Sequence, residues 1–326
     1  MKKEKDKKLF SSVLKEINKD LGVNITRLDE VSDFEKFPYY DTGFVLLDKA
    51  LNGGFGRGDV VEIYGPEGGG KTTFVLQLMG YWIKKFGLDV FYLDYESSLD
   101  KPWALKLIPD KEHFFTGKFI SLEKGGEAIR KILLGDIKVD VIIIDSVTNM
   151  LPNDLLTGEI GHQMIGMKAR YQSMMLEQLK GLINLKDCIL ICINQVRVKF
   201  SGMVATIDST SGHALRHLSS TRLGIKGLGG IYDSDKTRIG TEVVFDVRKH
   251  KHGIPFSTIK LPFKLEDGFN KSWSLYNYLF SIGEIKKAGS FMNFDGKNWR
   301  KMDLMEQPEE FFLKYITDRN LLDLEK

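Results

Sequence analysis

The sequence contains little cysteine, no long hydrophobic run and almost no net charge, and each shortage excludes a class of protein. The two cysteines, Cys188 and Cys192, lie four residues apart in one apolar segment. On a strand their side chains would share a face, but the extended backbone keeps them too far apart for a disulfide. We interpret them as small core residues of a protein from a reducing compartment.

No apolar stretch approaches the roughly 18 residues that a membrane-spanning helix needs. The basic N-terminus also lacks the apolar segment of a signal peptide. A net charge of +3 is too small to indicate a nucleic-acid partner by itself, so such a partner must be inferred from local features. We therefore expect a cytoplasmic protein.

The first segment of the chain predicts a helix with one apolar stripe. Its 3- and 4-residue spacing places the apolar side chains on one face, and Gly22 is expected to end the helix. The stripe consists of Phe10, Val13, Leu14, Ile17 and Leu21. Such a stripe packs either on its own domain or on a neighbouring subunit, and the spacing does not distinguish the two.

Strand and helix patterns alternate from about residue 40 onwards. A strand over 60–64 runs into a glycine-rich loop, and an apolar helix follows from 72 to about 86. Further strands are expected at 89–93, 139–144 and 189–193, and near 223–226, 242–248 and 257–263. The runs at 139–144 and 189–193 are almost entirely aliphatic, which is typical of strands buried on both faces of a parallel sheet.

These patterns predict an α/β fold with a mostly parallel central sheet flanked by helices. The last three strands are expected to be antiparallel. After about residue 265 the sequence changes to short helical patterns with Trp273 and Trp299, which indicates a small α+β C-terminal domain. At 326 residues, 42% hydrophobic and 28% charged, the chain has the size and composition for this arrangement.

The glycine-rich loop has the pattern of a phosphate-binding loop. It reads Gly65, Pro66, Glu67, Gly68, Gly69, Gly70, Lys71, Thr72. Adjacent glycines let backbone N–H groups surround a phosphate, Lys71 would reach the β and γ phosphates, and the Thr72 hydroxyl would bind magnesium. Because the loop lies between a predicted strand and a predicted helix, we interpret it as a site for ATP and Mg²⁺.

Polar residues follow three of the predicted strands. Asp145 ends one strand, where a carboxylate suits magnesium binding. An isolated aspartate there is more often a helix cap, but beside a phosphate-binding loop we favour the magnesium role. Glu96 could activate water as a general base, but Asp94 is an equal candidate on spacing alone. Gln195 is uncharged and could contact the γ phosphate. The residues thus predict an ATPase without saying what hydrolysis drives.

The motifs, taken in order, resemble those of the RecA family of DNA-strand-exchange recombinases over nearly the whole chain. They are Asp41–Gly43, Leu47–Asp48, Val61–Glu67, Glu96 with Leu99–Asp100, Val139–Val147, Gly158–Gly161, Ile193–Arg197, Ala214–Leu215 with Arg222, Lys249–Lys251, Pro255–Phe256 and Lys287–Gly289. The phosphate-binding loop alone occurs in many nucleotide hydrolases. Its combination with Gly-Glu-Ile-Gly and a Lys-x-Lys pair is specific to recombinases of this kind.

The resemblance implies roles for individual residues. Glu96 would be the catalytic base, in preference to Asp94. Asp100 and Trp103 would hold the adenine, and Thr73 would join the nucleotide contacts. Gln195 would transmit the state of the γ phosphate to a DNA-binding loop.

The resemblance also assigns a role to Lys249 and Lys251. They would reach across a subunit interface and stabilise the transition state at the neighbour's ATP, as an arginine finger does. Taken alone, the basic cluster 248–252 is more commonly a solvated strand.

Two loops, at about 157–169 and 197–213, would face DNA. Their small polar residues and scattered cations suit sequence-independent phosphate contacts, and their apolar residues could insert between bases. The expected DNA-binding residues are Ile165, Arg170, Ser173, Arg197, Lys199, Met203, Thr210, Ser211 and Gly212.

By resemblance, residues 1–36 form a polymerisation arm, 37–265 the ATPase core and 266–326 a small C-terminal domain. The expected partners are single-stranded DNA, homologous double-stranded DNA and further copies of the chain in a helical filament, in the cytoplasm of a bacterium or of a phage's host. Two alternatives are a hexameric helicase motor on the same core and a recombination mediator. The Lys-x-Lys pair and the N-terminal arm argue against the first, and the intact nucleotide residues argue against the second.

Overall fold

The computed structural model describes residues 2–22, 25, 39–158, 166–201, 204–209, 213–233, 235–253 and 255–321. The side chains of 2–9, 197–201, 204–209 and 213 are outside this description. The chain forms two compact units, Met1–Pro38 and Tyr39–Lys326. Among the described residues, no helix is both long and apolar enough to cross a membrane.

The first unit contains helix α1 (Lys2–Leu21), as predicted, and Gly22 after it has a positive φ of 62°. The apolar stripe of this helix is largely open to solvent. Phe10 is 64% exposed and Leu21 70% exposed. Asn18 closes the helix end by exchanging two hydrogen bonds with the backbone of Ile25.

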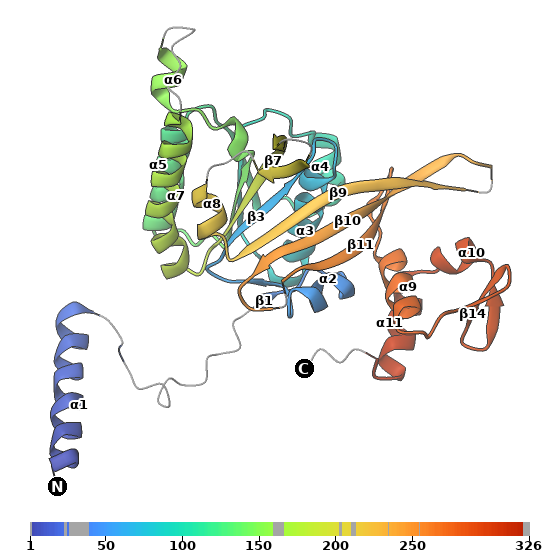
Figure 1. The fold of residues 1–326 in the computed structure, drawn as a ribbon, viewed down its shortest axis with the longest axis horizontal. Coiled ribbons are helices and arrows are strands. Elements are labelled where there is room, and N and C mark those ends of the chain that lie inside the picture. The colour runs from blue at the N-terminus through green and yellow to red at the C-terminus, as the bar shows by residue number, and fades with distance from the viewer. Residues whose placement is uncertain are drawn as a thin grey trace. The chain divides into compact units, whose positions relative to one another are not determined.

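The second unit is built on a large sheet with the strand order β12-β11-β10-β9-β3-β7-β6-β4-β5, and β8 pairs with β7 (Figure 1). The strands from β9 to β5 in this order run parallel, whereas β10, β11 and β12 are antiparallel to their neighbours. The parallel strands are β3 (Val60–Gly65), β4 (Val90–Asp94), β5 (Phe114–Lys118), β6 (Val141–Asp145), β7 (Ile189–Ser201) and β9 (Thr221–Tyr232). The predicted mostly parallel sheet is confirmed.

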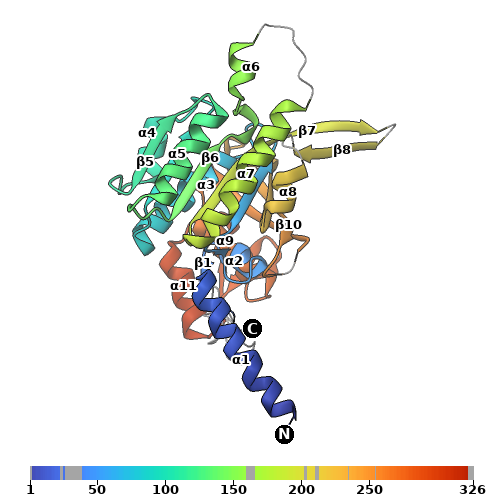
Figure 2. The same cartoon turned by 90° about the vertical axis from the view of Figure 1, so that its left-hand side faces the viewer.

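The aliphatic strands contribute side chains to two separate hydrophobic cores, because successive side chains point to opposite faces of the sheet. On β6, Val141 and Ile143 pack with the helices α3 (Lys71–Phe86) and α4 (Lys101–Leu107). Ile142 and Ile144 pack with α5 (Leu122–Leu134), α7 (Met167–Leu185) and α8 (His213–Leu218). Figure 2 shows α5 and α7 side by side over this second face.

The two cysteines contribute to the second of these cores. Both Cys188 and Cys192 are fully buried and unbridged, which confirms their interpretation as core residues. Burial raises the pKa of both thiols well above its ordinary value, because a thiolate would be poorly solvated there.

The segment expected as the second DNA loop differs from a plain loop. Strand β7 continues to Ser201 and forms an antiparallel hairpin with β8 (Val204–Ser209), pairing Val196 with Ser209 (Figure 2). The alternation of β-branched or aromatic residues with polar ones over 196–200 favours a strand, whereas the small polar residues that follow favour a loop.

The remaining elements of the core are short, apart from the long strand β10. They are β1 (Tyr39–Tyr40), α2 (Val45–Ala50), β2 (Phe55–Gly56), the 3-10 turn η1 (Val147–Asn149), α6 (Asn153–Thr157), β10 (Arg238–His250), β11 (Ser257–Lys264) and β12 (Gly268–Phe269). The antiparallel strands expected near 242–248 and 257–263 are thus present as β10 and β11. The strand expected near 223–226 is β9, which is antiparallel to β10 but runs parallel to β3, so that it belongs to the parallel part of the sheet.

The C-terminal part has a core of its own around Trp273, Phe294 and Phe312. Its elements are α9 (Lys271–Ser281), β13 (Lys286–Ala288), β14 (Phe291–Phe294), β15 (Lys297–Trp299), α10 (Lys301–Met305) and α11 (Glu309–Asp318). It has the expected mixture of helix and strand and also packs on Val45 and Leu46 of α2. The domain boundaries at 36/37 and 265/266 remain a prediction.

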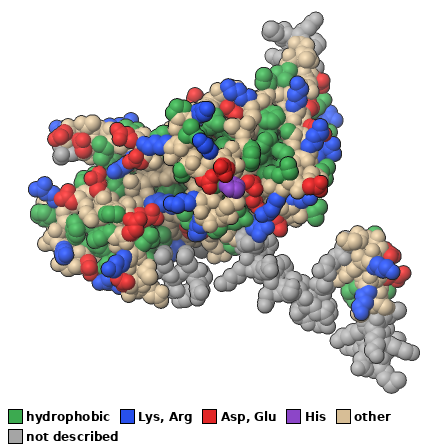
Figure 3. Space-filling model, turned by 180° about the vertical axis from the view of Figure 1, so that it is seen from behind, with side chains coloured by type: hydrophobic (Ala, Val, Ile, Leu, Met, Phe, Trp, Pro, Cys, Tyr) green, Lys and Arg blue, Asp and Glu red, His purple; other side chains and the backbone are tan. Residues whose placement is uncertain are grey.

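The face of the molecule in Figure 3 intersperses Lys and Arg with Asp and Glu. On the described part of this face the positive charges do not merge into one broad field. This agrees with the small net charge of the chain.

A buried aspartate at the start of α2 offers a test of the fold. Asp48 Oδ1 accepts hydrogen bonds from the Thr42 backbone N–H at 2.6 Å and from the Thr42 hydroxyl at 2.7 Å. Burial nevertheless raises the pKa of Asp48 from 3.8 to about 7. Between these values the native protein holds a proton that the unfolded chain has released, so native stability from this group falls as pH rises through the window.

We expect Asp48→Asn to remove this dependence, because Asn resembles the protonated carboxyl at every pH. The wild-type free energy of unfolding should fall relative to that of the variant by up to about 1.4 kcal/mol per pH unit between about pH 4 and 7. Urea unfolding at several pH values measures it. Asp136→Asn at an exposed position is the matched control, and parallel curves for wild type and Asp48→Asn would contradict the assignment.

Candidate functional site

The carboxyl ends of four neighbouring parallel strands bring the predicted site residues to one edge of the sheet. Gly65 at the end of β3 is in register with Gln195 on β7, and Asp94 at the end of β4 is in register with Asp145 on β6. Ligands of open α/β sheets bind at this edge. Residues from distant parts of the sequence therefore meet because the strands are parallel and aligned.

The glycine loop joins β3 to α3 as predicted. A Cβ atom on Gly65 would lie 1.9 Å from the carbonyl oxygen of Ile225, so only glycine fits against β9. Gly68 and Gly70 have positive φ values of 67° and 90°, which other residues rarely adopt. No side chain caps the N-terminus of α3, so its first N–H groups point to where a phosphate would bind.

Lys71, the first residue of α3, lies inside this loop. Its ammonium group donates to the carbonyl oxygens of Gly65 at 3.0 Å and Pro66 at 2.8 Å. Burial lowers the pKa of Lys71, while the nearby carboxylates of Asp145 and Glu96 act in the opposite direction. A phosphate would restore favourable surroundings for this partly desolvated cation.

Thr72 and Asp145 are brought together as the predicted magnesium residues. The Thr72 hydroxyl donates to Asp145 Oδ2 at 2.8 Å, and the Tyr92 hydroxyl donates to the same oxygen at 2.6 Å. Burial raises the pKa of Asp145 to about 6, although both hydrogen bonds favour its charged form. Hydroxyl and carboxylate oxygens are the donors that Mg²⁺ prefers, so this set fits the ion.

Glu96 lies beside Gln195 and Ser146. Its Oε1 accepts from the Ser146 hydroxyl at 2.7 Å and from Gln195 Nε2 at 2.9 Å. The rival Asp94 is 2% exposed, and among the described contacts its carboxylate accepts only a long 3.4 Å bond from the Leu99 N–H. Glu96 is thus the carboxylate that is directly connected to the predicted γ-phosphate sensor.

Asp100 and Trp103 lie at the start of α4. Asp100 caps the helix by accepting from the Trp103 N–H at 3.1 Å, and the Trp103 indole donates to the Thr73 hydroxyl at 3.4 Å. Lys106 lies above the Trp103 ring, 5.7 Å from its centre. The two residues expected to hold the adenine thus adjoin Thr73, the third expected nucleotide contact, next to the glycine loop.

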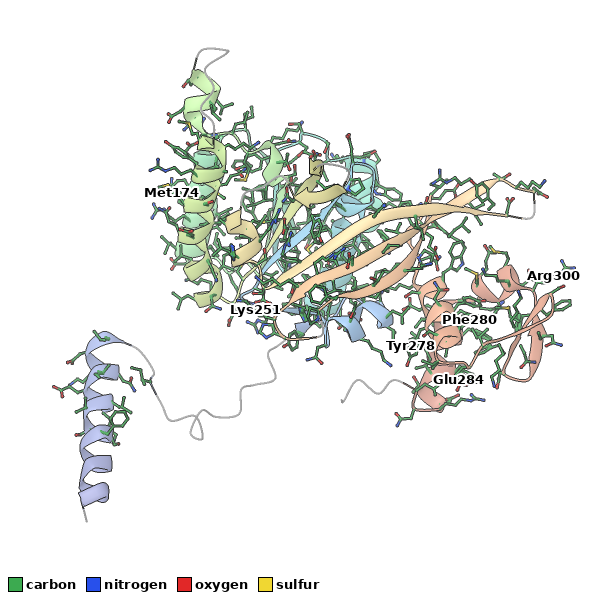
Figure 4. The ribbon with its side chains drawn as sticks, viewed as in Figure 1. Met174, Lys251, Tyr278, Phe280, Glu284 and Arg300 are labelled. Atoms are coloured by element: carbon green, nitrogen blue, oxygen red, sulfur yellow. The ribbon has the colours of Figure 1, made fainter. Side chains whose placement is uncertain are left out.

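Lys249 and Lys251 are not part of this assembly. They flank His250 at the end of β10, where His250 pairs with Thr221 of β9, and Thr221 pairs with Val61 of β3. Gly65 lies four residues further along β3, or about 13 Å of strand. Figure 4 marks Lys251 at this far end of the sheet.

The segment that carries these lysines is held in place by buried contacts. His250 bonds to the Leu51 carbonyl and to the Thr221 hydroxyl, both at 2.8 Å. Lys249 Nζ donates to the carbonyl oxygens of Arg216 at 2.9 Å and His217 at 3.1 Å, at the end of α8. Burial lowers the pKa of Lys249, and Lys251 beside it adds to this effect.

The predicted DNA-binding residues are only partly described. Arg170 is exposed near the start of α7, and the Ser173 hydroxyl donates to the Ala169 carbonyl at 2.7 Å. Arg197 and Lys199 are on β7, but their side chains lie outside the described residues. Ile165, Met203, Thr210, Ser211 and Gly212 also lie outside them.

Several residues of the site were missed from the sequence. They are Tyr92, Ser146, Thr148 and Asn194, each of which makes a hydrogen bond within the assembly. Tyr92 looks like an ordinary aromatic residue of a strand. Its position two residues before Asp94 is the only local signal that the two side chains point to the same face of the sheet.

The sequence also matches known proteins. The model of the RecA N-terminal domain matches residues 8–270. Protein RecA of Teredinibacter turnerae is 33% identical over 291 residues, covering 89% of this chain and 84% of that protein. Protein RecA of Bartonella henselae is 32% identical over 311 residues, covering 93% and 89%.

The family match covers the glycine loop, the carboxylates and the lysine pair whose geometry is described above. The relatives extend the similarity through most of the C-terminal part. The chain therefore belongs to the RecA family of ATP-dependent recombinases.

Proposed function

We propose that this chain is a DNA-stimulated ATPase that forms helical filaments on single-stranded DNA and exchanges strands with a homologous duplex. The observation that carries the proposal is the position of Lys249 and Lys251. Both are at the end of the sheet away from their own glycine loop, so a role for them in catalysis would be at the nucleotide of another subunit. A site completed by the next subunit fits an assembly of repeated copies.

Within one subunit, the glycine loop and α3 would hold the phosphates and Lys71 would neutralise part of their charge. Thr72 and Asp145 would hold Mg²⁺, which polarises the phosphate and screens its charge. Glu96 would accept the proton of the attacking water. Gln195, which donates to Glu96 at 2.9 Å, would orient that carboxylate and respond to the γ phosphate.

The neighbouring subunit would complete the reaction. Its Lys249 and Lys251 would stabilise the charge that develops on the phosphate in the transition state. Lys249 already contacts the end of α8, which follows the second proposed DNA segment. DNA binding and ATP hydrolysis would thereby be linked across each interface.

A closed ring and a helical filament both place nucleotide between subunits, so they must be distinguished by experiment. We expect electron microscopy with single-stranded DNA, Mg²⁺ and a non-hydrolysable ATP analogue to show open helical filaments. Pairing and exchange with a homologous duplex should require ATP, and a duplex of unrelated sequence is the control. Closed rings, or no exchange under any nucleotide condition, would contradict the proposal.

Glu96→Gln tests the base. The amide keeps the shape and the contact with Ser146 but cannot accept a proton, so DNA-stimulated turnover should fall about 10²- to 10⁴-fold. Nucleotide affinity, measured with a fluorescent ATP analogue, should change little. Ser98→Ala removes only the 3.4 Å contact on the other oxygen of Glu96 and serves as the control. Wild-type turnover by Glu96→Gln would show that another group is the general base.

The lysine pair allows a complementation test. A Lys249→Ala/Lys251→Ala double variant should bind nucleotide as an isolated subunit but lose most DNA-stimulated turnover. Mixed with inactive Glu96→Gln, it should recover activity, because intact Glu96 then faces intact lysines at about a quarter of randomly formed interfaces. Arg248→Ala, which removes the adjacent cation, is the control. A mixture as inactive as its components would show that the lysines do not act across the interface.

A further inference from the structure

Helix α7 is attached to the nucleotide site by two side chains on one face. Lys168 Nζ donates to the carbonyl oxygen of Thr148, and Gln172 Nε2 donates to that of Val147 at 2.7 Å. Lys168 and Gln172 are four residues apart and therefore adjacent on the helix surface. The turn η1 that they hold follows directly after Asp145 and Ser146.

The side chain of Thr148 contacts two successive residues of β7, Asn194 and Gln195. Its hydroxyl donates to Asn194 Oδ1 at 3.1 Å and accepts from the Gln195 backbone N–H at 3.2 Å. Asn194 is fully buried, and its amide nitrogen donates to Glu62 Oε1 at 2.8 Å. Glu62 in turn is paired with Arg222. The orientation of the Asn194 amide is therefore fixed by Thr148 at its oxygen and by Glu62 at its nitrogen.

The contacts continue from Gln195 to the proposed catalytic base. Gln195 Nε2 donates to Glu96 Oε1, the oxygen that also accepts from Ser146. An uninterrupted series of contacts thus runs from Lys168 through Thr148 and Gln195 to Glu96. All four residues are partly shielded from solvent, so losing one contact should affect the others more than it would in water.

The opposite face of α7 is available to solvent. Arg170 lies two residues from both Lys168 and Gln172, about 200° around the helix, and is exposed. Met174, one turn later on the same face, is 48% exposed, and Figure 4 shows it on the outer side of α7. One helix therefore carries the proposed DNA residue Arg170 on one side and the attachment to the nucleotide site on the other.

We propose that Thr148 and Lys168 are positioning residues that couple DNA contact at α7 to the orientation of Gln195 and Glu96. A displacement of α7 by DNA is passed through Lys168 to the Thr148 segment. The Thr148 hydroxyl then shifts the backbone of Gln195, and Gln195 reorients the carboxylate of Glu96. The inference rests on the proposed DNA-stimulated ATPase activity and assigns part of its coupling to two residues that do not touch the nucleotide.

The test compares turnover without DNA and at saturating single-stranded DNA, with the full-length chain. Thr148→Val removes the hydroxyl at nearly constant shape, Thr148→Ser retains it, and Lys168→Met removes only the ammonium group. We expect Thr148→Val and Lys168→Met to lower the stimulation ratio about fivefold or more, with an unchanged KM for ATP. Thr148→Ser should behave as wild type. Lys186→Met, at the far end of α7, controls for the loss of one cation.

Saturating DNA separates coupling from simple DNA affinity. If Lys168 only attracts phosphate, Lys168→Met needs more DNA but reaches the full wild-type rate, and this result would overturn the relay. The double variant Thr148→Val/Lys168→Met should be no worse than the more affected single variant, because both act in one series of contacts. If the fold-loss of stimulation in the double variant equals the product of the two single fold-losses, the two residues act independently and the relay is overturned.

Thr148→Val leaves Asn194 and the Gln195 N–H without one partner, so its folding must be checked. If thermal unfolding shows that Thr148→Val is strongly destabilised, the test rests on Lys168→Met alone. That variant should keep its fold because the Lys168 side chain is only partly buried. If wild type is not stimulated by DNA at all, the proposed function fails and the relay with it. If wild type is stimulated and both single variants keep the full ratio, only the relay is wrong.

Discussion

The parallel alignment of β3, β7, β6 and β4 is the constraint on which the rest of this structure depends. Aliphatic side chains pack on both faces of these strands, and the polar groups that would bind nucleotide lie at or near the carboxyl ends. The register then places Gly65 beside Gln195 and Asp94 beside Asp145. A one-residue slip would turn each of these side chains to the other face and separate the site.

The same alignment concentrates charge in a poorly solvated place. Asp145 is 2% exposed and its pKa is raised, whereas the pKa of the buried Lys71 is lowered. Both shifts show that the isolated side chains are poorly solvated. A divalent cation beside Asp145 and phosphates beside Lys71 would supply the missing counter-charges, so nucleotide and metal should bind together.

The two ends of the sheet have different tasks. The carboxyl edge carries the groups that would hold ATP and activate water, and the opposite edge carries Lys249 and Lys251, which we propose act at the nucleotide of another subunit. The contacts that link these regions to the proposed DNA segments pass through α7 and α8, which both lie on the same face of the sheet. Communication between DNA and nucleotide would thus use one of the two hydrophobic layers, and the layer around α3 would stay a rigid support.

Much of this was predictable from local sequence. The aliphatic runs determined which segments are buried strands, and the glycines with Lys71 and Thr72 determined the phosphate-binding loop, because backbone sterics and hydrophobic burial act at short range. The β7–β8 hairpin was missed because its alternating pattern lies beside small polar residues typical of loops. Local spacing also left Asp94 and Glu96 equivalent as bases.

The tertiary structure gave those two carboxylates different contacts, a distinction that only the family resemblance had made from the sequence, and it revealed Tyr92, Ser146 and Thr148 as parts of the site. The hydrogen bonds of these residues join segments that are 46 to 53 residues apart in sequence, and no local pattern encodes such a pairing. It also placed Lys249 and Lys251 away from their own glycine loop, which a list of motifs cannot do. The sequence determined which residues can carry the chemistry, and the strand register decided which of them meet, since register is a property of the whole packed sheet.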